Sequence, residues 1–353
     1  MRPSIVIFSA FVTPLRSGAE ACAEEVARSL CDRYDITIVA ARMRRDLPAK
    51  DVLQGVPVRR LGLGVPFDKW LYPFLAAFYA ARTRPQIVHA VLESYAGAAL
   101  ILCAWVAPAS KRMLTCQSTN TTTMLRPMHR AAHIVTAIST VLVKRAKRFG
   151  KNAHLIPNGL RLRDIPTLEK VPGRVLFVGR LEPIKGVDTL IQAYSKMVPL
   201  ILEKTSLHIV GDGSERVRLE HLAKDLGIGN RVKFLGYIAS PAVYKQFAEA
   251  ELFCGLSRSE ALGNVFLEAQ AARCAVIATN VGGIPDIVKD RSTGLLVPPD
   301  SVAATKDALE KCLIDKGFAM KIASAGKFHA QDFDWGSIAE RYGELYEELL
   351  AKK

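Results

Sequence analysis

The stretch Ser257-Arg-Ser-Glu-Ala-Leu-Gly-Asn-Val-Phe-Leu-Glu-Ala-Gln-Ala-Ala272 is the most informative part of the chain. It follows an apolar run, Glu251–Leu256, that is typical of a buried strand, and a helix is predicted to open near Gly263. The first amides of such a helix, here those of Gly263, Asn264 and Val265, lack intrahelical partners and form a ready site for a phosphate or an oxyanion. The pattern therefore predicts a strand, a ligand-facing loop and a helix in direct succession.

Two carboxylates lie on either side of this predicted helix end. Glu260 is in the loop before the helix, and Glu268 follows in its second turn. A carboxylate can accept hydrogen bonds from two hydroxyl groups, so both residues are candidates for binding a sugar or a ribose. The alternative is structural: Ser257 and Glu260 would form a capping box, and Glu268 would be a solvated helix residue.

Two further strand-to-helix turns carry glycines or cations. The segment Thr279-Asn-Val-Gly-Gly-Ile-Pro-Asp-Ile-Val288 follows a predicted strand and places two glycines before a proline, which marks a tight turn able to approach a ligand. The segment Val175-Leu-Phe-Val-Gly-Arg-Leu-Glu-Pro-Ile-Lys-Gly186 ends a buried strand at Gly179 and adds Arg180 and Lys185. Two cations in one such loop can neutralise a diphosphate, although an ordinary surface loop could also carry them. Because these turns follow neighbouring parallel strands, together they predict a ligand crevice.

Predicted strands and amphipathic helices alternate along the chain, which indicates an α/β fold with parallel, doubly wound sheets. The polar segment Arg161–Pro172 lacks apolar periodicity and is the predicted linker. We expect one domain over 1–165 and a second over 166–335, with a cleft between them. Apolar positions 338, 342, 345, 346 and 349 form one helical face, so 336–353 is expected to pack on a domain. The predicted strands cover residues 4–9, 35–40, 87–91, 112–116, 134–138, 153–156, 174–178, 206–210, 231–235, 251–255, 275–278 and 295–297.

Composition indicates a globular protein of two ordinary domains. The chain has 353 residues, half of them hydrophobic, and its seven cysteines show no metal-like spacing and are expected to be buried and reduced. The longest uncharged apolar run, Tyr95–Ser110, is shorter than the ~20 residues of a membrane span. The expected location is the cytoplasm, with a peripheral position on the inner face of the membrane as an option.

The whole excess of positive charge belongs to the N-terminal half. Residues 1–165 contain 24 Lys and Arg against 10 Asp and Glu, whereas residues 166–353 contain 24 of each. Such a field favours an anionic partner, which would be a phosphorylated substrate, a membrane surface or a nucleic acid. A merely solubilising surface is the alternative.

The order of these motifs resembles the retaining GT-B glycosyltransferases of family four. In the C-terminal half, where the resemblance is nearly complete, it rests on Pro157-Asn-Gly159, Gly179-Arg180 with Lys185-Gly186, Gly211-Asp-Gly213, Phe234-Leu-Gly236, Glu260 with Glu268, and Gly282-Gly-Ile-Pro285. In the N-terminal half it is looser and rests on Ser17-Gly-Ala-Glu20, Val88-His89 and the final Trp335–Tyr346 segment. The resemblance implies two Rossmann-like domains facing a cleft, a nucleoside-diphosphate-sugar donor in the C-terminal domain, and a last helix that crosses back onto the N-terminal domain.

The same resemblance implies roles for individual residues. Arg180 and Lys185 would hold the donor diphosphate and its departing charge. Glu260 would bind hydroxyls of the donor sugar, and Glu268 would bind the ribose. The remaining donor contacts would come from Gly18, Gly179 and the backbone of Gly263, Asn264 and Val265. The resemblance also implies neither metal nor cofactor, since the two cations would do what Mg²⁺ does elsewhere.

Two positions depart from the family pattern. Gln117 stands in Thr115-Cys-Gln-Ser118 where the family often has His, and Arg161 follows Leu160 where Asp is common. Gln117 can donate a hydrogen bond to a sugar hydroxyl but cannot accept a proton at neutral pH. His89, in the third predicted strand, is a candidate sugar or acceptor contact, although a lone His in an apolar run is more often a core residue.

The expected reaction is transfer of a sugar from a nucleoside-diphosphate-sugar to an acceptor hydroxyl, with retention at the anomeric carbon. No residue stands out as a covalent nucleophile, so departure and attack on the same face of the sugar are favoured over double displacement. One alternative is a nucleotide-sugar epimerase on the same frame. Another is a basic nucleic-acid-binding protein. That function would leave Glu260 and Glu268 unexplained, and the sequence contains no aromatic-interleaved RNA-binding motif, so no nucleic-acid partner is expected.

An aromatic segment, Trp70–Tyr79, bears on the acceptor. One helical stripe predicts ordinary core packing and consists of Leu71, Phe74, Leu75 and Phe78. Trp70 and Tyr79 lie off this stripe beside several cations and are expected to be exposed. Because an aromatic, cationic helix suits a membrane interface, we expect the N-terminal domain to rest on an anionic leaflet and to act on an anionic lipid or lipid-linked saccharide. Core packing of the whole segment is the alternative.

Overall fold

The computed structural model describes residues 2–15 and 18–352, so Ser17 of the predicted Ser17–Glu20 motif lies outside the described residues. The chain divides into two compact units: residues up to 159 together with those from 335 onward form the first unit, and residues 160–334 form the second. The predicted boundary at 165/166 lies slightly later than the observed one. The reason is that Leu160 already belongs to the second unit, where its N–H donates to the Phe333 carbonyl (2.8 Å) and it forms a β-bridge with Asp334.

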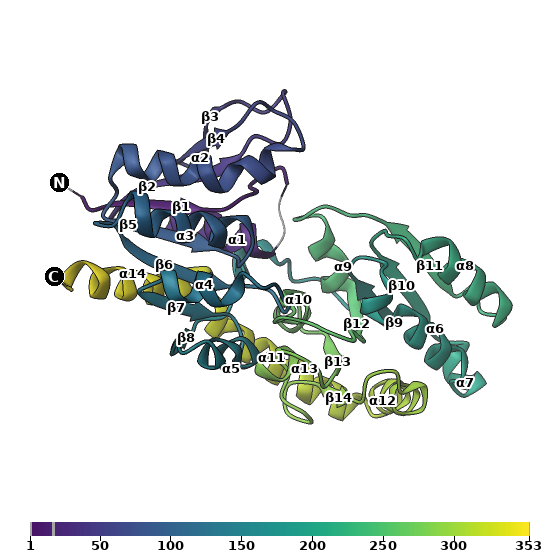
Figure 1. Cartoon of the computed structure of the whole chain (residues 1–353). Coiled ribbons are helices and arrows are strands. Elements are labelled where there is room, and N and C mark those ends of the chain that lie inside the picture. Colours follow the sequence, from purple (N-terminus) through teal and green to yellow (C-terminus); the bar gives the residue numbers. More distant parts are fainter. Residues whose placement is uncertain (1, 16–17, 353) are drawn as a thin grey trace. The chain divides into compact units, whose positions relative to one another are not determined.

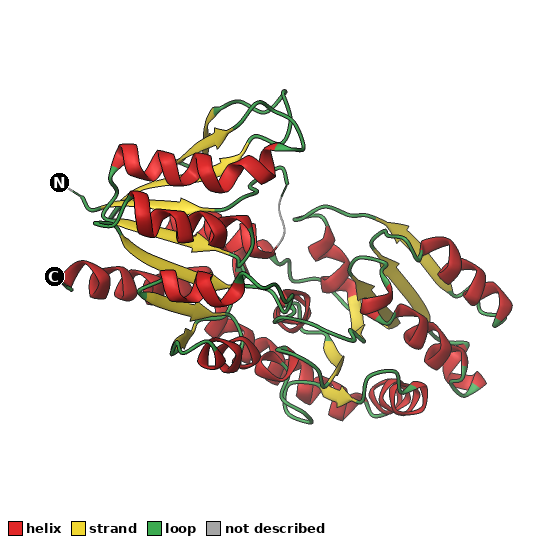
Figure 2. Ribbon diagram, in the orientation of Figure 1, coloured by secondary structure: helices red, strands yellow, loops and turns green. Residues whose placement is uncertain are grey.

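The first unit is a layered α/β structure around one sheet, with red helices against yellow strands in Figure 2. Its strands lie in the order β3-β4-β2-β1-β5-β6-β7-β8, and neighbouring strands are parallel except for β3 and β4. The strands are β1 (Ser4–Phe8), β2 (Asp35–Ala41), β3 (Lys50–Leu53), β4 (Val56–Leu61), β5 (Ile87–Val91), β6 (Lys111–Cys116), β7 (Ile134–Ala137) and β8 (Ala153–Leu155). The helices are α1 (Gly18–Leu30), α2 (Asp68–Thr83), α3 (Tyr95–Val106), α4 (Leu125–Ala131), α5 (Thr140–Arg148) and α14 (Trp335–Ala351).

The second unit is built on a wholly parallel sheet in the order β11-β10-β9-β12-β13-β14. Its strands are β9 (Val171–Val178), β10 (Ser206–Val210), β11 (Val232–Gly236), β12 (Ala250–Gly255), β13 (Ala275–Thr279) and β14 (Leu295–Val297). Its α-helices are α6 (Val187–Ser195), α7 (Pro199–Leu202), α8 (Arg216–Asp225), α9 (Val243–Glu249), α10 (Asn264–Ala271), α11 (Ile284–Ile287), α12 (Val302–Ile314) and α13 (Lys316–Ala330), and its 3-10 turns are η1 (Leu162–Asp164), η2 (Pro183–Lys185) and η3 (Gln331–Phe333). The strand order reverses between β9 and β12, and sheets of this kind bind ligands beyond the carboxyl ends of the strands at such a reversal.

Helix α14 packs on the first unit, as the resemblance implied. It lies against α1, and its predicted apolar face is buried at Ile338, Tyr342, Leu345, Tyr346 and Leu349. In Figure 1 this yellow helix lies with the purple and blue elements from the start of the chain. The first unit is therefore assembled from two separate stretches of sequence.

The predicted core stripe on α2 is wrong, because it faces outward. The side chains of Phe74 and Phe78 are 64% and 66% exposed, and Leu71 is exposed as well, whereas Leu75 is partly buried. Small side chains allow α2 to approach α3 closely, and the Tyr72 hydroxyl donates to the Val39 carbonyl (2.7 Å), so this opposite side of the helix is the buried one. The buried side carries Tyr72, Pro73, Ala76, Ala77 and Ala80.

The exposed apolar surface continues beyond that stripe. Trp70 is 57% exposed, as predicted, whereas Tyr79 is partly buried. The Lys69 ammonium lies 5.9 Å from the centre of the Trp70 ring, and Trp105 at the end of α3 is 82% exposed. Within residues 2–15 and 18–352, no helix has both the length and the apolar character needed to cross a bilayer.

The hairpin of β3 and β4 was not predicted. Its turn residues Gln54 and Gly55 both have positive φ (49° and 87°), the conformation that a two-residue hairpin turn requires. Pro57 lies inside β4, and proline in an apolar run argues against a strand unless the strand lies near a sheet edge, as here. Each strand that was predicted is present close to its predicted bounds, and all seven cysteines are free thiols, six of them buried.

Candidate functional site

Glycine turns bring the loops after β9, β12 and β13 into contact at the strand-order reversal. A Cβ at Gly186, between η2 and α6, would lie 2.2 Å from the Leu256 carbonyl oxygen. A Cβ at Gly282 would lie 1.9 Å from the carbonyl oxygen of Glu260, and the Gly283 N–H donates to that same oxygen (3.1 Å). Only glycine permits these approaches, so the predicted turns do converge on one edge of the sheet.

Arg258 ties the same loops together and was not singled out from the sequence. Its backbone N–H donates to the Ile184 carbonyl (2.7 Å). Its guanidinium pairs with Asp188 (3.0 Å) and Asp300 (2.7 Å). The Asp partners lie 70 and 42 positions away, so nothing in the local sequence of Arg258 could have revealed this role. These contacts fix the loop that carries Lys185 against the loop that carries Glu260.

Lys185 and Glu260 form an ion pair in front of α10. The Lys185 Nζ lies 2.5 Å from Glu260 Oε2, which also accepts a hydrogen bond from the Ser257 hydroxyl (3.2 Å). The two charged side chains are only 19% and 18% exposed, so each keeps the other neutralised in a partly buried position. The capping-box alternative for Ser257 is wrong, because the helix begins later, at Asn264.

The N-terminus of α10 is free of side-chain caps. Gly263 stands at the N-cap in the left-handed conformation (φ 89°), and among the described residues no side chain accepts a hydrogen bond from the first helical amides. A Cβ at Gly263 would lie 2.6 Å from the Phe266 ring and 3.1 Å from Glu260 Cγ, so glycine is required there. The amides of Gly263, Asn264 and Val265 thus begin the helix beside the Glu260 carboxylate, as predicted.

Glu268 lies in the second turn of α10, partly buried, and its carboxylate has no hydrogen-bond or ion-pair partner in the part of the chain that the structure describes. Burial raises the pKa of its carboxyl group from 4.5 to about 7. Arg180 is exposed just after β9, where Gly179 donates to the Val210 carbonyl (3.0 Å), and its guanidinium is likewise unpaired among the described residues. Among the described residues, this edge therefore offers the unpaired carboxyl group of Glu268, the unpaired guanidinium of Arg180 and the mutually neutralised Lys185–Glu260 pair.

His89 is a core residue of the first unit. It is fully buried on β5, and both ring nitrogens are satisfied at 2.7 Å, one by the Tyr346 hydroxyl and the other by the Thr115 hydroxyl. Burial lowers the pKa of His89 to about 3, so the ring stays neutral. These contacts favour the structural alternative over a sugar or acceptor contact, because neither nitrogen is left for a ligand.

Gln117 follows β6 and is also nearly buried. Its side-chain amide pairs reciprocally with that of Asn158, through two hydrogen bonds of 2.9 Å. The backbone N–H of Gln117 donates to Glu93 (2.8 Å), whose other oxygen pairs with Arg145. Gln117 therefore holds the Pro157–Gly159 motif against β6, and this pairing would have to open before its side chain could reach a ligand. Gly18 opens α1 and is exposed, and its donor role stays a prediction.

A metal site was not expected, and one buried group has the composition of one. The ligand atoms of Glu93, Cys116 and His129 lie within 4.8 Å of one another. The Arg145 guanidinium already neutralises Glu93, and burial raises the pKa of the Cys116 thiol well above its usual value, so this group is a poor cation ligand set. Asp332 and Asp334, at η3, could each offer a carboxylate to a metal ion. Among the described residues, however, no third ligand atom lies close enough to complete a metal-binding group with them.

Two Rossmann-like units, with the last helix returning to the first of them, make this the GT-B fold, the architecture of a large class of glycosyltransferases. Solved structures agree over nearly all of both chains. Sucrose-phosphate synthase from Thermosynechococcus elongatus is similar with a TM-score of 0.86 at 22% identity and covers 100% of each chain. Anabaena HepE, solved in complex with UDP and glucose, is similar with a TM-score of 0.80 at 21% identity, over 98% of this chain and 100% of that one. At such identities the likeness establishes the fold.

The chain belongs to glycosyltransferase family 4. Residues 16–164 match the family described as Glycosyltransferase Family 4, and residues 161–329 match Glycosyl transferases group 1. The D-inositol 3-phosphate glycosyltransferase of Mycobacteroides abscessus is 36% identical over 182 residues, which are 50% of this chain and 40% of that protein. The GDP-mannose-dependent alpha-(1-6)-phosphatidylinositol monomannoside mannosyltransferase of Mycobacterium tuberculosis is 34% identical over 193 residues, 52% of this chain and 48% of that protein. The chain thus spans less than half the length of these curated relatives.

Proposed function

We propose that this protein transfers a sugar from a nucleoside-diphosphate-sugar to an acceptor hydroxyl, with retention at the anomeric carbon and without a metal ion. The observation that carries the proposal is the Lys185–Glu260 pair in front of the uncapped end of α10, with the unpaired Glu268 one turn behind it. Membership of a glycosyltransferase family supports it, as do relatives and structural neighbours whose names include GDP-mannose and UDP.

Donor binding replaces the Lys185–Glu260 ion pair with contacts to both ends of the sugar-diphosphate linkage. The ammonium of Lys185 and the guanidinium of Arg180 bind diphosphate oxygens, together with the first amides of α10. The freed Glu260 carboxylate accepts hydrogen bonds from hydroxyls of the sugar, and Glu268 accepts them from the ribose. The ligand-free pair keeps two partly buried charges compensated until the donor supplies complementary groups.

The chemical step breaks the bond between the anomeric carbon and the diphosphate oxygen and forms a bond from that carbon to the acceptor oxygen on the same face. The acceptor proton passes to a leaving phosphate oxygen. Negative charge grows on the diphosphate during this step, so Arg180, Lys185 and the amides of α10 stabilise the transition state more than the bound donor.

The test is product analysis with a panel of nucleoside-diphosphate-sugars and hydroxyl acceptors. Free nucleoside diphosphate and a new glycoside, detected by mass spectrometry, are the expected products, and NMR should show that the anomeric configuration of the donor is kept. A nucleotide-sugar recovered with one inverted carbon, without a glycoside, would instead identify an epimerase. Glu260→Gln should abolish turnover, whereas Glu203→Gln, an exposed glutamate of the same unit, should leave the rate unchanged.

For the acceptor, we propose an anionic lipid or lipid-linked saccharide at a membrane surface. The exposed apolar face of α2 and of the residue before it consists of Phe67, Trp70, Leu71, Phe74 and Phe78. Helix α3 packs between α2 and α4, and the exposed cations on α4 and α5 are Arg126, Arg130, Lys144, Lys147 and Arg148. Aromatic side chains insert at the headgroup level, and each nearby cation adds about 1 kcal/mol of attraction to an anionic leaflet. The relative named for a phosphatidylinositol monomannoside supports this proposal.

Co-sedimentation with liposomes decides the membrane proposal. Binding to anionic vesicles should exceed binding to neutral ones and should fall at high salt. The double variant Phe74→Ser/Phe78→Ser should lose most of this binding, while Leu200→Ser, which removes an equally exposed leucine from the second unit, should not. Binding that ignores lipid charge and survives the double variant would leave a soluble acceptor as the better hypothesis.

A further inference from the structure

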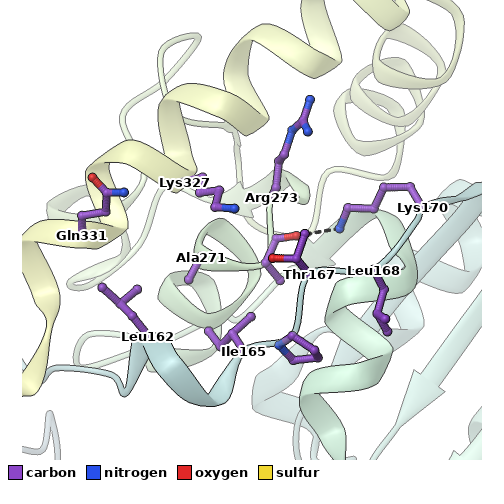
Figure 3. Close-up of a pocket in the computed structure, with 11 residues that line it drawn as sticks. Leu162, Ile165, Thr167, Leu168, Lys170, Ala271, Arg273, Lys327 and Gln331 are labelled. Atoms are coloured by element: carbon purple, nitrogen blue, oxygen red, sulfur yellow. Dashed lines mark hydrogen bonds between the residues drawn. The ribbon is translucent and has the colours of Figure 1, made fainter.

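One pocket lies within the second unit, away from the donor loops. It has a volume of 240 Å³ and is formed by the 162–170 segment, the turn after α10, α13 and the start of η3. We call it the linker pocket, because the 162–170 segment is the chain's path from the first unit into β9. In Figure 3 Lys327 reaches in from α13 and Lys170 from the linker, with Thr167 between them in this view.

The linker pocket is lined by three cations and by no acidic residue. The cations are Lys170, Arg273 and Lys327, and neither Arg273 nor Lys327 has an ion-pair partner among the described residues. Burial, with the neighbouring charges of Arg273 and Lys327, lowers the pKa of Lys170. Residues 166–353 contain equal numbers of basic and acidic residues. The three cations of the pocket therefore lie together without acidic neighbours in its lining, although acidic residues are as common as basic ones in this half of the chain. Three like charges around one cavity are unfavourable unless an anion joins them.

The other lining groups suit an anion that carries an apolar body. Thr167 and Gln331 offer a hydroxyl and an amide as hydrogen-bond donors. The apolar lining of the pocket consists of Leu162, Ile165, Pro166, Leu168, Ala271 and Ala272. The Lys170 ammonium donates to the Ala272 carbonyl (2.7 Å) and the Phe247 carbonyl (3.1 Å). Because its N–H groups are used in these bonds, Lys170 contributes positive charge to the pocket, whereas the N–H groups of Arg273 and Lys327 can donate to a ligand.

The linker pocket is separate from the donor loops. Lys170 precedes β9 and Arg180 follows it, so the two sites lie at opposite edges of the sheet. β9 has eight residues, which at ~3.3 Å each place the sites ~26 Å apart. A ligand in this pocket would contact the linker, near which the chain enters the second unit, and η3, near which the chain leaves it.

We infer that the linker pocket is a binding site for a small organic phosphomonoester. In the structure Arg273 is exposed, and in Figure 3 its guanidinium extends away from Lys170 and Lys327. With this side chain turned toward the cavity, Arg273 and Lys327 bind the phosphate group under the positive potential of Lys170, and the organic part lies against the apolar lining. Because an arginine fork binds phosphate oxygens in pairs, a phosphate dianion suits this donor set better than a single carboxylate. This inference does not depend on the proposed sugar transfer.

Isothermal titration of the full chain with phenyl phosphate, inorganic phosphate and benzyl alcohol tests the inference. Phenyl phosphate should bind at least threefold more tightly than inorganic phosphate, and benzyl alcohol should not bind. Lys327→Ala and Arg273→Asn should each weaken phenyl phosphate at least fivefold. Asn suits the positive φ of position 273 (61°), so the second variant removes the charge without new backbone strain. Lys321→Ala, on the exposed side of the same helix α13, is the control and should stay within twofold.

Chemical acetylation of lysines, mapped by mass spectrometry, gives an independent measurement on the wild-type protein. Phenyl phosphate should protect Lys327 from an acylating reagent and leave Lys321 reactive. Absence of binding, equal affinity for phenyl phosphate and inorganic phosphate, or unprotected Lys327 would each overturn the inference. So would binding that is lost in Arg180→Ala but kept in Lys327→Ala, because the phosphate would then sit among the donor loops.

Discussion

The carboxyl group of Glu268 should make the second unit less stable at neutral and alkaline pH, and Glu268→Gln should remove that cost. Burial raises the pKa of this carboxyl group from 4.5 to about 7 in the folded protein. Between these values the unfolded chain has already released the proton that the folded chain still holds, so the free energy of unfolding falls as pH rises through this window. The cost is absent below about pH 4.5 and fully present above about pH 7.

The magnitude follows from the width of that window. About 2.5 pH units at ~1.4 kcal/mol each give an upper limit of roughly 3–4 kcal/mol. The side chain keeps some contact with water, which reduces the desolvation, so we expect ~1–3 kcal/mol above pH 7. Glutamine has a similar shape and cannot ionise, so the ligand-free variant should gain this amount at pH 8 and little at pH 5.

The assay must report on the second unit alone. The three tryptophans, Trp70, Trp105 and Trp335, all belong to the first unit, so their fluorescence does not follow unfolding of the second. Amide hydrogen exchange of peptides from β12 and β13 does, and protection in the variant should exceed wild type by ~10–100-fold at pH 8. Glu203→Gln replaces an exposed glutamate of the same unit and should change nothing. Equal protection in wild type and Glu268→Gln at pH 8 would refute the reasoning.

Four further outcomes are expected around the same loops. If Glu268 binds the ribose as a carboxylate, measured donor affinity should fall as pH drops below about 7 in wild type and stay flat in Glu268→Gln. Arg180→Ala and Lys185→Ala should lower kcat more than they raise the donor Kd, because their contribution grows with charge on the leaving group, and equal losses would indicate simple binding. EDTA should leave the steady-state rate unchanged, and inactivation that Mg²⁺ restores would contradict metal independence. Gly282→Ala should lower thermal stability and donor affinity well beyond Gly227→Ala, since both glycines have positive φ but only the new Cβ at position 282 meets backbone, 1.9 Å from a carbonyl oxygen.

The turns at the carboxyl ends of the second unit's strands were predicted well from the sequence because their signals are local. A buried strand followed by a glycine turn and a helix identifies one edge of a parallel sheet, and each such turn was placed correctly. The contacts between turns are different in kind. Arg258 has partners 70 and 42 positions away, and no spacing rule indicates which distant loop an arginine will join.

The first unit was predicted less well, for two physical reasons. Apolar periodicity on α2 identifies a stripe but not the direction it faces, and here small residues face inward because they allow close packing against α3. The roles of His89 and Gln117 depend on Tyr346 and Asn158, which lie 257 and 41 positions away. A polar residue at a strand end looks the same in sequence whether its hydrogen bonds go to a ligand or to a distant side chain.

Because α14 belongs to the first unit, the first unit can be completed only after the second unit has been synthesised. A ribosome releases residues 160–334 before Trp335–Ala351, so the nascent chain can complete the second unit while the first still lacks its final helix. Until then α1 lacks its packing against α14, and His89 lacks both its ring contact with Tyr342 and its hydrogen bond to Tyr346. A stop codon near position 334 would therefore spare the downstream unit and leave the upstream one, although fully translated up to residue 159, with an open core.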